Sequence, residues 1–538
     1  MPRDLAADQA MLSGLVQLMQ NRDLDRAAAI AQRELAGGFE HPLLFNVLAA
    51  RLEQDGRFAD SLRLLERAVA IAPKDVAARN ALALCLQRLE RPGEALRHID
   101  VLLKDHPELP FAHASRGNAL IALGWLEQAR LSHLRALELE PGNVAAGAAL
   151  ASIATHRGRH AEARAWAGQV LAAVPNFPDA VMSLAAAELA AGETASAESR
   201  LHRLLVDARV APLDKARATG LLADVLDATH RYAEAFAAYR TRNDALRQLY
   251  ARFSEGAVTA YARRLLADLP ALAGAPAAAG PGDDGGSAGH AFLIGFPRTG
   301  TTLLEVALDG HPRVASLDEH ELLTESVLRF LGNEPDLAGL ARADERELEA
   351  LRAAYWGRVR AAGVDPAGKL FLDKYPMNTL KLPLIVRLFP RAKILFAQRD
   401  PRDVVLSCFR RRFRMNAAMY ELLTLKGATA LYGAVMEFAA AAEPALGLAW
   451  RAVVYERLVS EFAAETRAIL EFLGLDWVEG LEDFGARAQA REHATPSTAQ
   501  LARGLERAGI GHWRHYEAPL APVLAELGAW ATRLGYAP

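Results

Sequence analysis

The sequence has few cysteines, almost no net charge and no long apolar run. Two cysteines among 538 residues are too few for a disulfide framework or a thiolate metal site. Lys and Arg number 62 against 65 Asp and Glu, which gives no support to general binding of nucleic acid or a membrane surface. No run of about 18 uncharged apolar residues occurs, so no membrane span is predicted. Residues 1–8 lack the basic and apolar regions of a secretory signal, so we expect a cytoplasmic protein.

The N-terminal half repeats with a period of 34 residues. A proline, a turn residue and a small residue recur in each repeat: Pro73, Pro107, Pro141 and Pro175; Gly56, Glu90, Gly124, Gly158 and Gly192; Ser61, Ala95, Ala129, Ala163 and Ala197. Glycine ends a first helix, the small residue allows a second helix to approach closely, and proline stops that second helix. These helix–turn–helix units resemble the tetratricopeptide repeat.

We expect the repeat array to cover residues 1–265 as an α-solenoid. Residues 9–36 form a degenerate first repeat, and after an insertion at 210–214 the pattern resumes. Stacked repeats expose a concave surface that commonly holds a peptide or another protein. The alternative is that the array only packs against the rest of its own chain. Residues 266–289, rich in Ala, Gly and Pro, are predicted to be a flexible linker to a second domain at 290–538.

The second domain begins with a phosphate-loop pattern. A strand-like apolar run leads into Gly-Phe-Pro-Arg-Thr-Gly-Thr-Thr at 295–302, and helical spacing follows. The two glycines have the spacing of the nucleoside-triphosphatase loop, with Thr302 in the hydroxyl position. Thr301 stands where that loop has its lysine, and the cation of the loop is Arg298. We therefore expect a phosphate site that works without a metal, rather than an ATPase.

A second strand–loop–helix pattern supplies another set of phosphate ligands. Arg399 follows the strand candidate, and Ser407 and Arg411, four apart, are predicted to share a face of the next helix. Two arginines and a serine that converge would bind a second phosphate. The alternative is ion pairing of these arginines with Asp400 and Asp403 at a solvated helix start.

The Pro-Arg-Thr-Gly-Thr-Thr loop and the Arg-Asp-Pro-Arg-Asp…Ser…Arg segment together resemble the sulfotransferases that use 3′-phosphoadenosine 5′-phosphosulfate (PAPS). In that family the first motif binds the 5′-phosphosulfate and the second binds the 3′-phosphate. The resemblance covers roughly residues 290–538. It is closest to protein-tyrosine sulfotransferases, through His-Pro-Arg-Val at 311–314 and the acidic pair at 318–319. It implies a P-loop-like α/β domain with a parallel sheet, and no metal.

The same resemblance assigns roles to single residues. It places Glu319 as the base, with His320 as the rival, and Lys374 as the group that stabilises charge on the bridging oxygen. Arg298 would contact the 5′-phosphosulfate, and Ser497 would contact the sulfuryl group or the 5′-phosphate; both are counted among the catalytic residues. The residues expected to hold the nucleotide are Arg298, Thr299, Gly300, Thr301, Thr302, Arg399, Ser407, Arg411, Tyr455, Ser497, Arg503 and His512. At His512 the sequence departs from the tyrosine-directed branch, where lysine is usual.

The sequence thus predicts a PAPS-dependent sulfotransferase whose array recruits the acceptor, with tyrosine of a peptide or protein as the first choice. Glycan, lipid or small-molecule acceptors stay open. So do an interaction scaffold with an inactive nucleotide-binding domain, and a P-loop kinase. Asp318, Glu319 and Glu321 have the local alternative of capping a helix that begins there. The basic run at 410–414 is weak evidence for nucleic acid in a neutral chain, and no such partner is expected.

Overall fold

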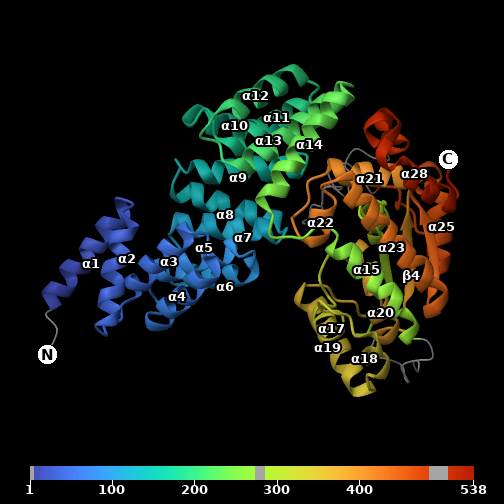
Figure 1. Ribbon diagram of the computed structural model, residues 1–538, viewed down its shortest axis with the longest axis horizontal. Helices are drawn as coiled ribbons and strands as arrows, with labels where there is room; N and C mark the ends of the chain where they lie inside the picture. Colours follow the sequence, from blue (N-terminus) through green and yellow to red (C-terminus); the bar gives the residue numbers. More distant parts are fainter. Residues whose placement is uncertain (1–4, 273–284, 484–506, 538) are drawn as a thin grey trace. The chain divides into compact units, whose positions relative to one another are not determined.

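The computed structural model describes residues 5–272, 285–483 and 507–537 (Figure 1). Its contacts divide the chain into two compact units. The first unit comprises Met1–Thr155 and Ala161–Ser183, and the second comprises His156–His160 and Leu184–Pro538. In the part of the chain that the structure describes, no helix has the length and apolar character needed to cross a membrane.

Residues 5–268 are a succession of helices. Their bounds are α1 Leu5–Gln20, α2 Leu24–Ala36, α3 Pro42–Gln54, α4 Phe58–Ile71, α5 Val76–Arg88, α6 Pro92–Asp105, α7 Pro110–Ala122, α8 Leu126–Leu139, α9 Val144–His156, α10 His160–Ala173, α11 Pro178–Ala190, α12 Thr194–Val206, α13 Pro212–Ala228, α14 Tyr232–Leu249 and α15 Ala257–Asp268. The second helix of each predicted repeat ends two residues before the recurring proline, which confirms the helix–turn–helix reading of the 34-residue period.

A left-handed turn separates the two helices of each repeat. The turn residues with positive φ are Gly56, Glu90, Gly124, Gly158 and Gly192. Arg22 and His230 adopt the same conformation, with φ of 59° and 61°. The small residues five positions later are fully buried: Ala27, Ser61, Ala95, Ala129, Ala163, Ala197 and Ala235. Arg22 carries no sequence signal for a left-handed turn, so the regular register of the first repeat becomes visible only in the structure.

The C-terminal part is built on one five-stranded sheet in the order β2-β3-β1-β4-β5. All neighbouring strands are parallel. The strands are β1 Gly289–Gly295, β2 Val314–Asp318, β3 Leu370–Lys374, β4 Lys393–Gln398 and β5 Ala449–Val454. The predicted fold class, a helical repeat followed by an α/β domain with a parallel sheet, is confirmed.

Helices surround this sheet (Figure 1). They are α16 Thr301–Asp309, α17 Thr324–Phe330, α18 Leu337–Arg342, α19 Glu345–Ala361, α20 Leu382–Leu388, α21 Pro401–Arg410, α22 Ala417–Glu421, α23 Leu425–Leu446, α24 Tyr455–Ser460, α25 Phe462–Leu473 and α28 Glu517–Arg533. Short 3₁₀ helices are η1 Leu269–Leu272, η2 Pro376–Lys381, η3 Arg507–Gly509 and η4 His512–Tyr516.

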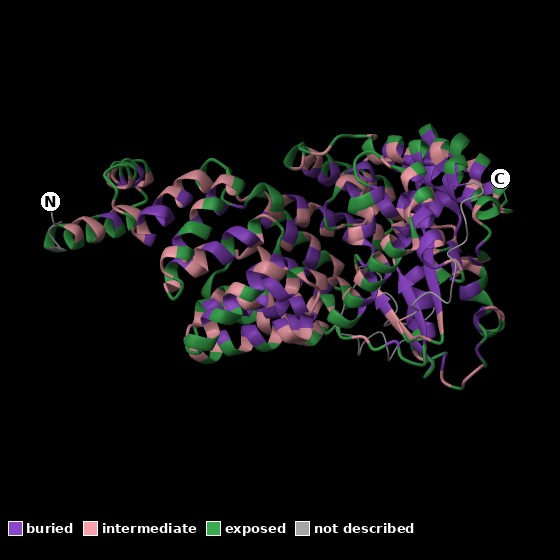
Figure 2. Ribbon diagram, turned by 90° about the horizontal axis from the view of Figure 1, so that it is seen from below, coloured by how far each residue is buried: buried purple, intermediate pink, exposed green. Residues whose placement is uncertain are grey.

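Two hydrophobic cores cover the two faces of the sheet, whose strands are buried (Figure 2). On β1, Phe292 and Ile294 point into one core with α15, α19, α20, α21, α23 and α28. Ala291 and Leu293 point into the other core with α16, α24 and α25. This alternation with apolar residues on both sides is expected of parallel strands covered by helices.

The helix α15 belongs to the core of the α/β domain, although it continues the helical series of the array. Ala262 and Leu265 are fully buried among the side chains that cover the sheet, and Leu269 and Leu272 of η1 join them. At the other end of the predicted linker, Gly286 accepts a hydrogen bond from the Gly368 N–H. The ends of segment 266–289 thus contact the α/β domain, while residues 273–284 lie outside the described residues.

Candidate active site

The candidate site lies where the parallel strands end. The connection after β1 leads toward β2, on one side of the sheet, whereas the connection after β4 leads toward β5, on the other. Open α/β sheets bind ligands at the carboxyl ends of strands where the connections diverge in this way. Gly295 of β1 lies opposite Ala397 of β4, and Lys374 of β3 lies opposite both Leu293 and Asp318. Loops from all five strands therefore start at one edge.

The loop after β1 is tightly folded and requires its two glycines. Gly300 has φ of 98° at the start of α16, and a Cβ there would lie 2.5 Å from Cδ2 of Tyr455. A Cβ on Gly295 would lie 2.7 Å from the carbonyl oxygen of Ala397. Thr379 fastens this strand end, because its hydroxyl donates to the Gly295 carbonyl at 2.7 Å and accepts from the Gly295 N–H at 3.0 Å. Only glycine lets the loop approach its neighbours this closely.

Threonines and an arginine line this loop. Thr299, Thr301 and Thr302 are buried, with 3–6% of their surface exposed, and the Thr299 hydroxyl donates to the Phe296 carbonyl at 2.7 Å. Arg298 adopts φ of 73°, a conformation that costs energy for a residue with a side chain. Strained backbone of this kind concentrates at functional sites.

Three arginines lie within electrostatic reach of one another: Arg298 in the loop after β1, Arg399 directly after β4, and Arg411 directly after α21. Arg298 Nε donates to the hydroxyl of Ser407 at 3.1 Å, which joins the two predicted phosphate motifs. Burial, together with the positive charges of Arg411 and Arg399, lowers the pKa of Arg298 to about 9. Cations held this close favour an anionic ligand, and arginine presents the forked donors that phosphates accept.

The guanidinium of Arg399 makes two hydrogen bonds to backbone carbonyls and one contact with an aromatic ring. Its Nη1 donates to the Arg298 carbonyl at 3.2 Å and its Nη2 to the Gly509 carbonyl at 2.5 Å. Its guanidinium lies over the ring of Tyr455, 4.5 Å from the centroid. Arg399 is 8% exposed, and its buried Nε has no hydrogen-bond partner among the described residues. A buried donor without a partner is a place where a ligand acceptor fits.

The prediction that Ser407 and Arg411 share a helix face needs correction. The helix α21 ends at Arg410, and Arg411 is the first residue beyond it, with an extended backbone. Its N–H still bonds to the carbonyls of Ser407 and Cys408, so it stays close to the helix end. The next carbonyls, of Phe409 and Arg410, are bound by side chains of α14.

Opposite the arginines, Lys374 lies buried between acidic residues. Its ammonium is fully buried, forms an ion pair with Asp318, lies 3.1 Å from Glu319 Oε1 and reaches Thr302 Oγ1 at 3.4 Å. Burial disfavours the charged ammonium, but the carboxylates of Asp318 and Glu319 overcome that effect and raise the pKa of Lys374. The lysine is therefore a fixed positive charge between the phosphate loop and Glu319.

Glu319 is positioned by its backbone as well as by Lys374. It has φ of 53°, and its N–H donates to the Lys374 carbonyl at 2.7 Å. Its side chain is 41% exposed, so an acceptor can reach the carboxylate. The local alternative for this acidic stretch is wrong, because α17 begins only at Thr324 and the carboxylates of Asp318 and Glu319 face Lys374.

The rival base, His320, is partly buried beside Glu319. Its Nδ1 lies 2.9 Å from the carbonyl oxygen of Asp318. Because a carbonyl only accepts, this contact places the proton of the neutral ring on Nδ1.

Four of the predicted cofactor residues lie in the last part of the chain, and the structure describes two of them, Tyr455 and His512. Tyr455 begins α24 directly after β5 and touches both Gly300 and Arg399. His512 lies in η4, where its Nε2 is 3.1 Å from Asp227 Oδ1 at the end of α13. Ser497 and Arg503 lie outside the described residues. The cofactor contacts assigned to these four residues remain predictions.

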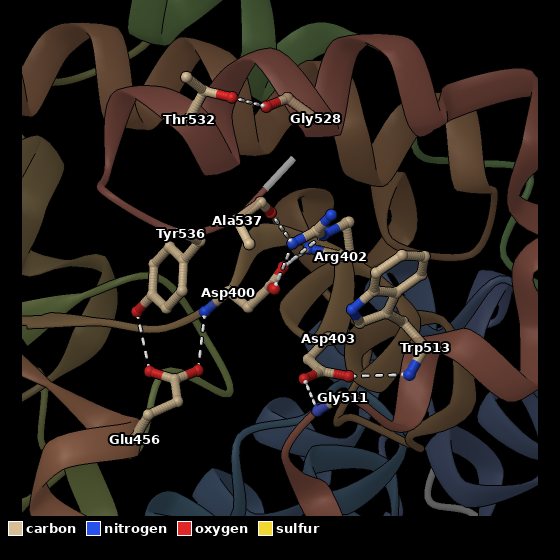
Figure 3. A network of polar contacts seen from close by, with 10 residues as sticks. All are labelled: Asp400, Arg402, Asp403, Glu456, Gly511, Trp513, Gly528, Thr532, Tyr536 and Ala537. Atoms are coloured by element: carbon tan, nitrogen blue, oxygen red, sulfur yellow. Dashed lines mark hydrogen bonds and ion pairs between the residues drawn. The ribbon is translucent and has the colours of Figure 1, made fainter.

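A polar network fixes the described C-terminal segment to the start of α21 and to α24 (Figure 3). Asp403 accepts from the N–H groups of Gly511 and Trp513 at 2.7 and 2.9 Å. Glu456 accepts from the Asp400 N–H at 3.1 Å and from the Tyr536 hydroxyl at 2.8 Å. The acidic residues beside Arg399 thus bind backbone and side chains of their own domain, and Asp400 pairs with Arg402 at 2.8 Å. The alternative of a solvated ion-pair cluster does not hold.

Comparison with known proteins assigns both parts of the chain. Residues 291–479 match the model of the sulfotransferase family, and residues 52–119 match a tetratricopeptide-repeat model. The C-terminal domain is a sulfotransferase-family domain. The resemblance drawn from the sequence motifs is thereby confirmed.

Several curated proteins are similar to this sulfotransferase domain. An uncharacterized protein of Aquifex aeolicus is 29% identical over 245 residues, covering 43% of this chain and 31% of its own length. Protein-tyrosine sulfotransferase 2 of Gallus gallus is 25% identical over 46% of this chain and 69% of its own. Protein-tyrosine sulfotransferase of Drosophila melanogaster is 30% identical over 35% and 38%. The chain therefore spans about a third of the first relative and about two thirds of the second.

Among solved structures, a tetratricopeptide repeat protein from Parabacteroides merdae aligns with 44% of this chain and 92% of its own, with a TM-score of 0.37 and 18% identity. The repeat assignment rests on the 34-residue register and on the family model.

Sequence reasoning missed three groups that build this site. Asp318 was recognised as acidic but not as the partner of the buried lysine. Thr379, which fastens Gly295, and Arg242, which binds the end of α21, carried no motif. Only the order of the strands and the packing of α14 bring these residues to the site, so no local pattern signals them.

Proposed function

We propose that the chain is a PAPS-dependent sulfotransferase that transfers the sulfuryl group to a hydroxyl acceptor, tyrosine of a peptide or protein being the first candidate. The observation that supports this proposal most is that two groups of charged side chains lie at the same edge of the sheet. Arg298, Arg399 and Arg411 gather on one side. Lys374 and the partly exposed Glu319 lie on the other. A polyanionic donor and a neutral acceptor need these two environments.

The donor site fits a nucleotide with two phosphate groups. The loop at 295–300 leaves no room for a Cβ on its glycines, so its backbone approaches closely, and it leads into the N-terminus of α16. The buried Nε of Arg399 lacks a partner among the described residues and points to a second anionic group. We assign the 5′-phosphosulfate to Arg298 and to Thr299–Thr302, and the 3′-phosphate to Arg399, Ser407 and Arg411.

The chemical step requires a base and a stabilised leaving group. Glu319 would accept the proton of the acceptor hydroxyl as the oxygen attacks sulfur. Lys374, fixed between Glu319 and the hydroxyl of Thr302, would stabilise the negative charge that develops on the bridging oxygen as the S–O bond breaks. PAPS, when bound, supplies the sulfuryl group; the chain's residues orient it and hold the charges.

The role of the repeats follows from their architecture and from the relatives. Repeats of this type expose a concave surface suited to a peptide, and relatives of the sulfotransferase domain are named protein-tyrosine sulfotransferases. We propose that the array recruits a protein or peptide acceptor to the domain, and that the chain works in the cytoplasm. A glycan, lipid or small-molecule hydroxyl is the second candidate acceptor.

Calorimetry with adenosine 3′,5′-bisphosphate (PAP) tests the donor assignment on the full chain. We expect wild type to bind PAP equally well with and without Mg²⁺, and Arg399→Ala to weaken binding strongly. Arg391→Ala, an exposed arginine of the same domain, serves as the control and should bind as wild type. Absence of PAP binding by wild type contradicts the proposal. Metal-dependent ATP binding in its place would favour a kinase.

Transfer assays then separate an enzyme from a scaffold. Wild type with labelled PAPS and a tyrosine-containing peptide should release PAP and yield sulfated peptide. PAP binding without transfer to any tyrosine, glycan or small-molecule acceptor would favour an interaction scaffold with an inactive domain.

A further inference from the structure

The helix α21, which carries part of the donor site, ends against a helix of the repeat array. Arg242 of α14 donates from Nη2 to the Phe409 carbonyl at 2.6 Å and from Nη1 to the Arg410 carbonyl at 2.8 Å. Asn243 adds a bond from Nδ2 to the Phe409 carbonyl at 3.0 Å, and its Oδ1 accepts from Arg242 Nε at 2.8 Å. The last two carbonyls of α21 are thus bound by one pair of neighbouring side chains.

These contacts satisfy a specific need of the helix. The last carbonyls of an α-helix have no partner within the helix and carry its negative partial charge. A guanidinium provides two parallel donors and a positive charge, which match two adjacent carbonyls. Arg242 and Asn243 are 3% and 0% exposed, so water cannot replace them there.

The surroundings of Arg242 are shaped to hold it. A Cβ on Gly220 of α13 would lie 2.7 Å from Cδ of Arg242, so the glycine makes the space for the arginine stem. One residue of α13, Asp227, pairs with Arg410 and also accepts from the hydroxyl of Tyr516. Backbone and side chain at the end of α21 are therefore both held by α13 and α14, within the same compact unit.

The end of α21 matters because of what it carries. Ser407, in its last turn, accepts the hydrogen bond of Arg298 Nε, and Arg411 follows the helix directly. These residues belong to the two motifs assigned above to the donor nucleotide. A shift at Phe409 and Arg410 moves Ser407 and Arg411 with them, since the helix backbone is continuous.

We propose that Arg242 and Asn243 are positioning residues for the donor site, so that the last repeat-type helix pair completes the 3′-phosphate site of the sulfotransferase domain. This inference rests on the proposed function. It assigns α13 and α14 a role that an array serving only to recruit acceptors does not have: they hold the end of α21 in the position at which Ser407 and Arg411 meet the 3′-phosphate.

Charge adds to geometry in this arrangement. Burial lowers the pKa of Arg242 to about 10, and the positive charges of Arg412 and Arg411 act in the same direction, against Asp224 and Tyr239. Arg242 thus stands within electrostatic reach of Arg411, behind the proposed phosphate ligands. Its charge favours an anion at that place.

The test compares two nucleotides that differ by the 3′-phosphate. PAP and adenosine 5′-phosphate are titrated by calorimetry into the full chain, as wild type, Arg242→Lys and Asn243→Ala. We expect each variant to bind PAP about 5- to 10-fold more weakly, as loss of one or two hydrogen bonds implies, and adenosine 5′-phosphate within about twofold of wild type. In transfer assays KM for PAPS should rise more than kcat falls.

Matched controls come from the same helix. Arg240→Lys and Asp244→Ala change exposed neighbours and should bind both nucleotides as wild type. If Arg242→Lys does not fold, Asn243→Ala decides. Unchanged PAP affinity in the variants overturns the inference, and so does an equal loss for both nucleotides, which would indicate a general structural role. If wild type itself fails to bind PAP, the proposed function falls and the inference with it.

Discussion

The two sides of the candidate site differ in their balance of positive and negative side chains. On the side of β2 and β3, Lys374 is buried against Asp318 and Glu319, and this group has more negative than positive charges. On the side of β1 and β4, Arg298, Arg399 and Arg411 are close enough to lower the pKa of Arg298. On the first side, the lysine already pairs with carboxylates of the protein. On the second side, a bound anion would offset the repulsion between the arginines. The difference separates a place for proton transfer from a place for a polyanion.

The largest effect is expected from Lys374→Met, which breaks the acidic side. Asp318 would be left buried without its cation, so the free energy of unfolding should fall by about 3–5 kcal/mol. Transfer should fall by about 10²–10³. Urea unfolding and the transfer assay measure the two losses.

A second variant shows whether the stability loss comes from the buried charge. Asp318→Asn combined with Lys374→Met should regain stability but not activity. Lys381→Met, which breaks a pair with the half-exposed Glu321, should cost at most about 1 kcal/mol. If Lys374→Met were inactive but as stable as wild type, the ion pair between Lys374 and Asp318 would not contribute to the free energy of unfolding.

Glu319→Gln should remove the base while leaving the arginine side intact. We expect kcat to fall by about 10²–10⁴, because the amide cannot take the acceptor proton. The dissociation constant of PAP should stay within about twofold of the wild-type value. Glutamine is neutral and nearly equal in size to glutamate, and the substitution leaves the residues assigned to the nucleotide unchanged. Steady-state kinetics and calorimetry on the same preparations measure both.

The neighbouring acid and the rival base provide the comparison for that variant. Glu321→Gln, two residues further on, should retain activity because its carboxylate is paired with Lys381. Full turnover by Glu319→Gln together with its loss in His320→Ala would move the base to His320.

Arg298→Met should act in the opposite sense to Lys374→Met. PAP binding should weaken by about 10- to 100-fold, as expected for a charge-assisted contact. Without ligand, the melting temperature should stay level or rise slightly, because one of three neighbouring positive charges is removed. Scanning calorimetry with and without PAP measures both quantities, and exposed Arg313→Met is the control. A large loss of stability without ligand would mean that the arginines stabilise the fold, and would contradict their assignment to an anion site.

The smallest effect concerns the carboxylate next to Lys374 in the sequence. Asp373 lies on the opposite face of β3, hydrogen-bonded to the hydroxyl of Tyr355 at 2.9 Å and to Asn378 at 3.3 Å. Burial raises its pKa to about 7, against about 3.9 in the unfolded chain. Between about pH 4 and 7 the folded state therefore keeps a proton that the unfolded state releases, so this residue's contribution to stability falls as pH rises through that window.

Asp373→Asn should remove this dependence. The variant should lose less stability than wild type between pH 5 and pH 7.5 in urea unfolding, and Glu349→Gln, an exposed acid, should behave as wild type. Equal slopes for Asp373→Asn and wild type would show that the carboxylate is already ionised when folded. The contrast between Asp318, paired with a lysine, and Asp373, hydrogen-bonded to the neutral Tyr355 and Asn378, would then be lost.

The sequence predicted the fold and the motifs of the site because these are local patterns. The 34-residue period specifies each turn and each buried small residue, and the loop at 295–302 is contiguous. The prediction for Ser407 and Arg411 was partly wrong, because α21 ends at Arg410, where its last carbonyls are bound by Arg242, over 160 residues earlier in the chain. The capping role considered for the acidic stretch was wrong for the same reason: its partner, Lys374, is 55 residues from Glu319.

By itself, then, the sequence determined the repeats, the sulfotransferase motifs and most residues of the candidate site. Periodicity and short motifs follow from backbone geometry over a few residues, so they can be read without the fold. The tertiary structure decided which charges meet, because the strand order β2-β3-β1-β4-β5 places Asp318 beside Lys374 and Gly295 beside β4. It also decided that α13–α15 pack with the sulfotransferase domain, where a buried arginine and a helix end satisfy each other.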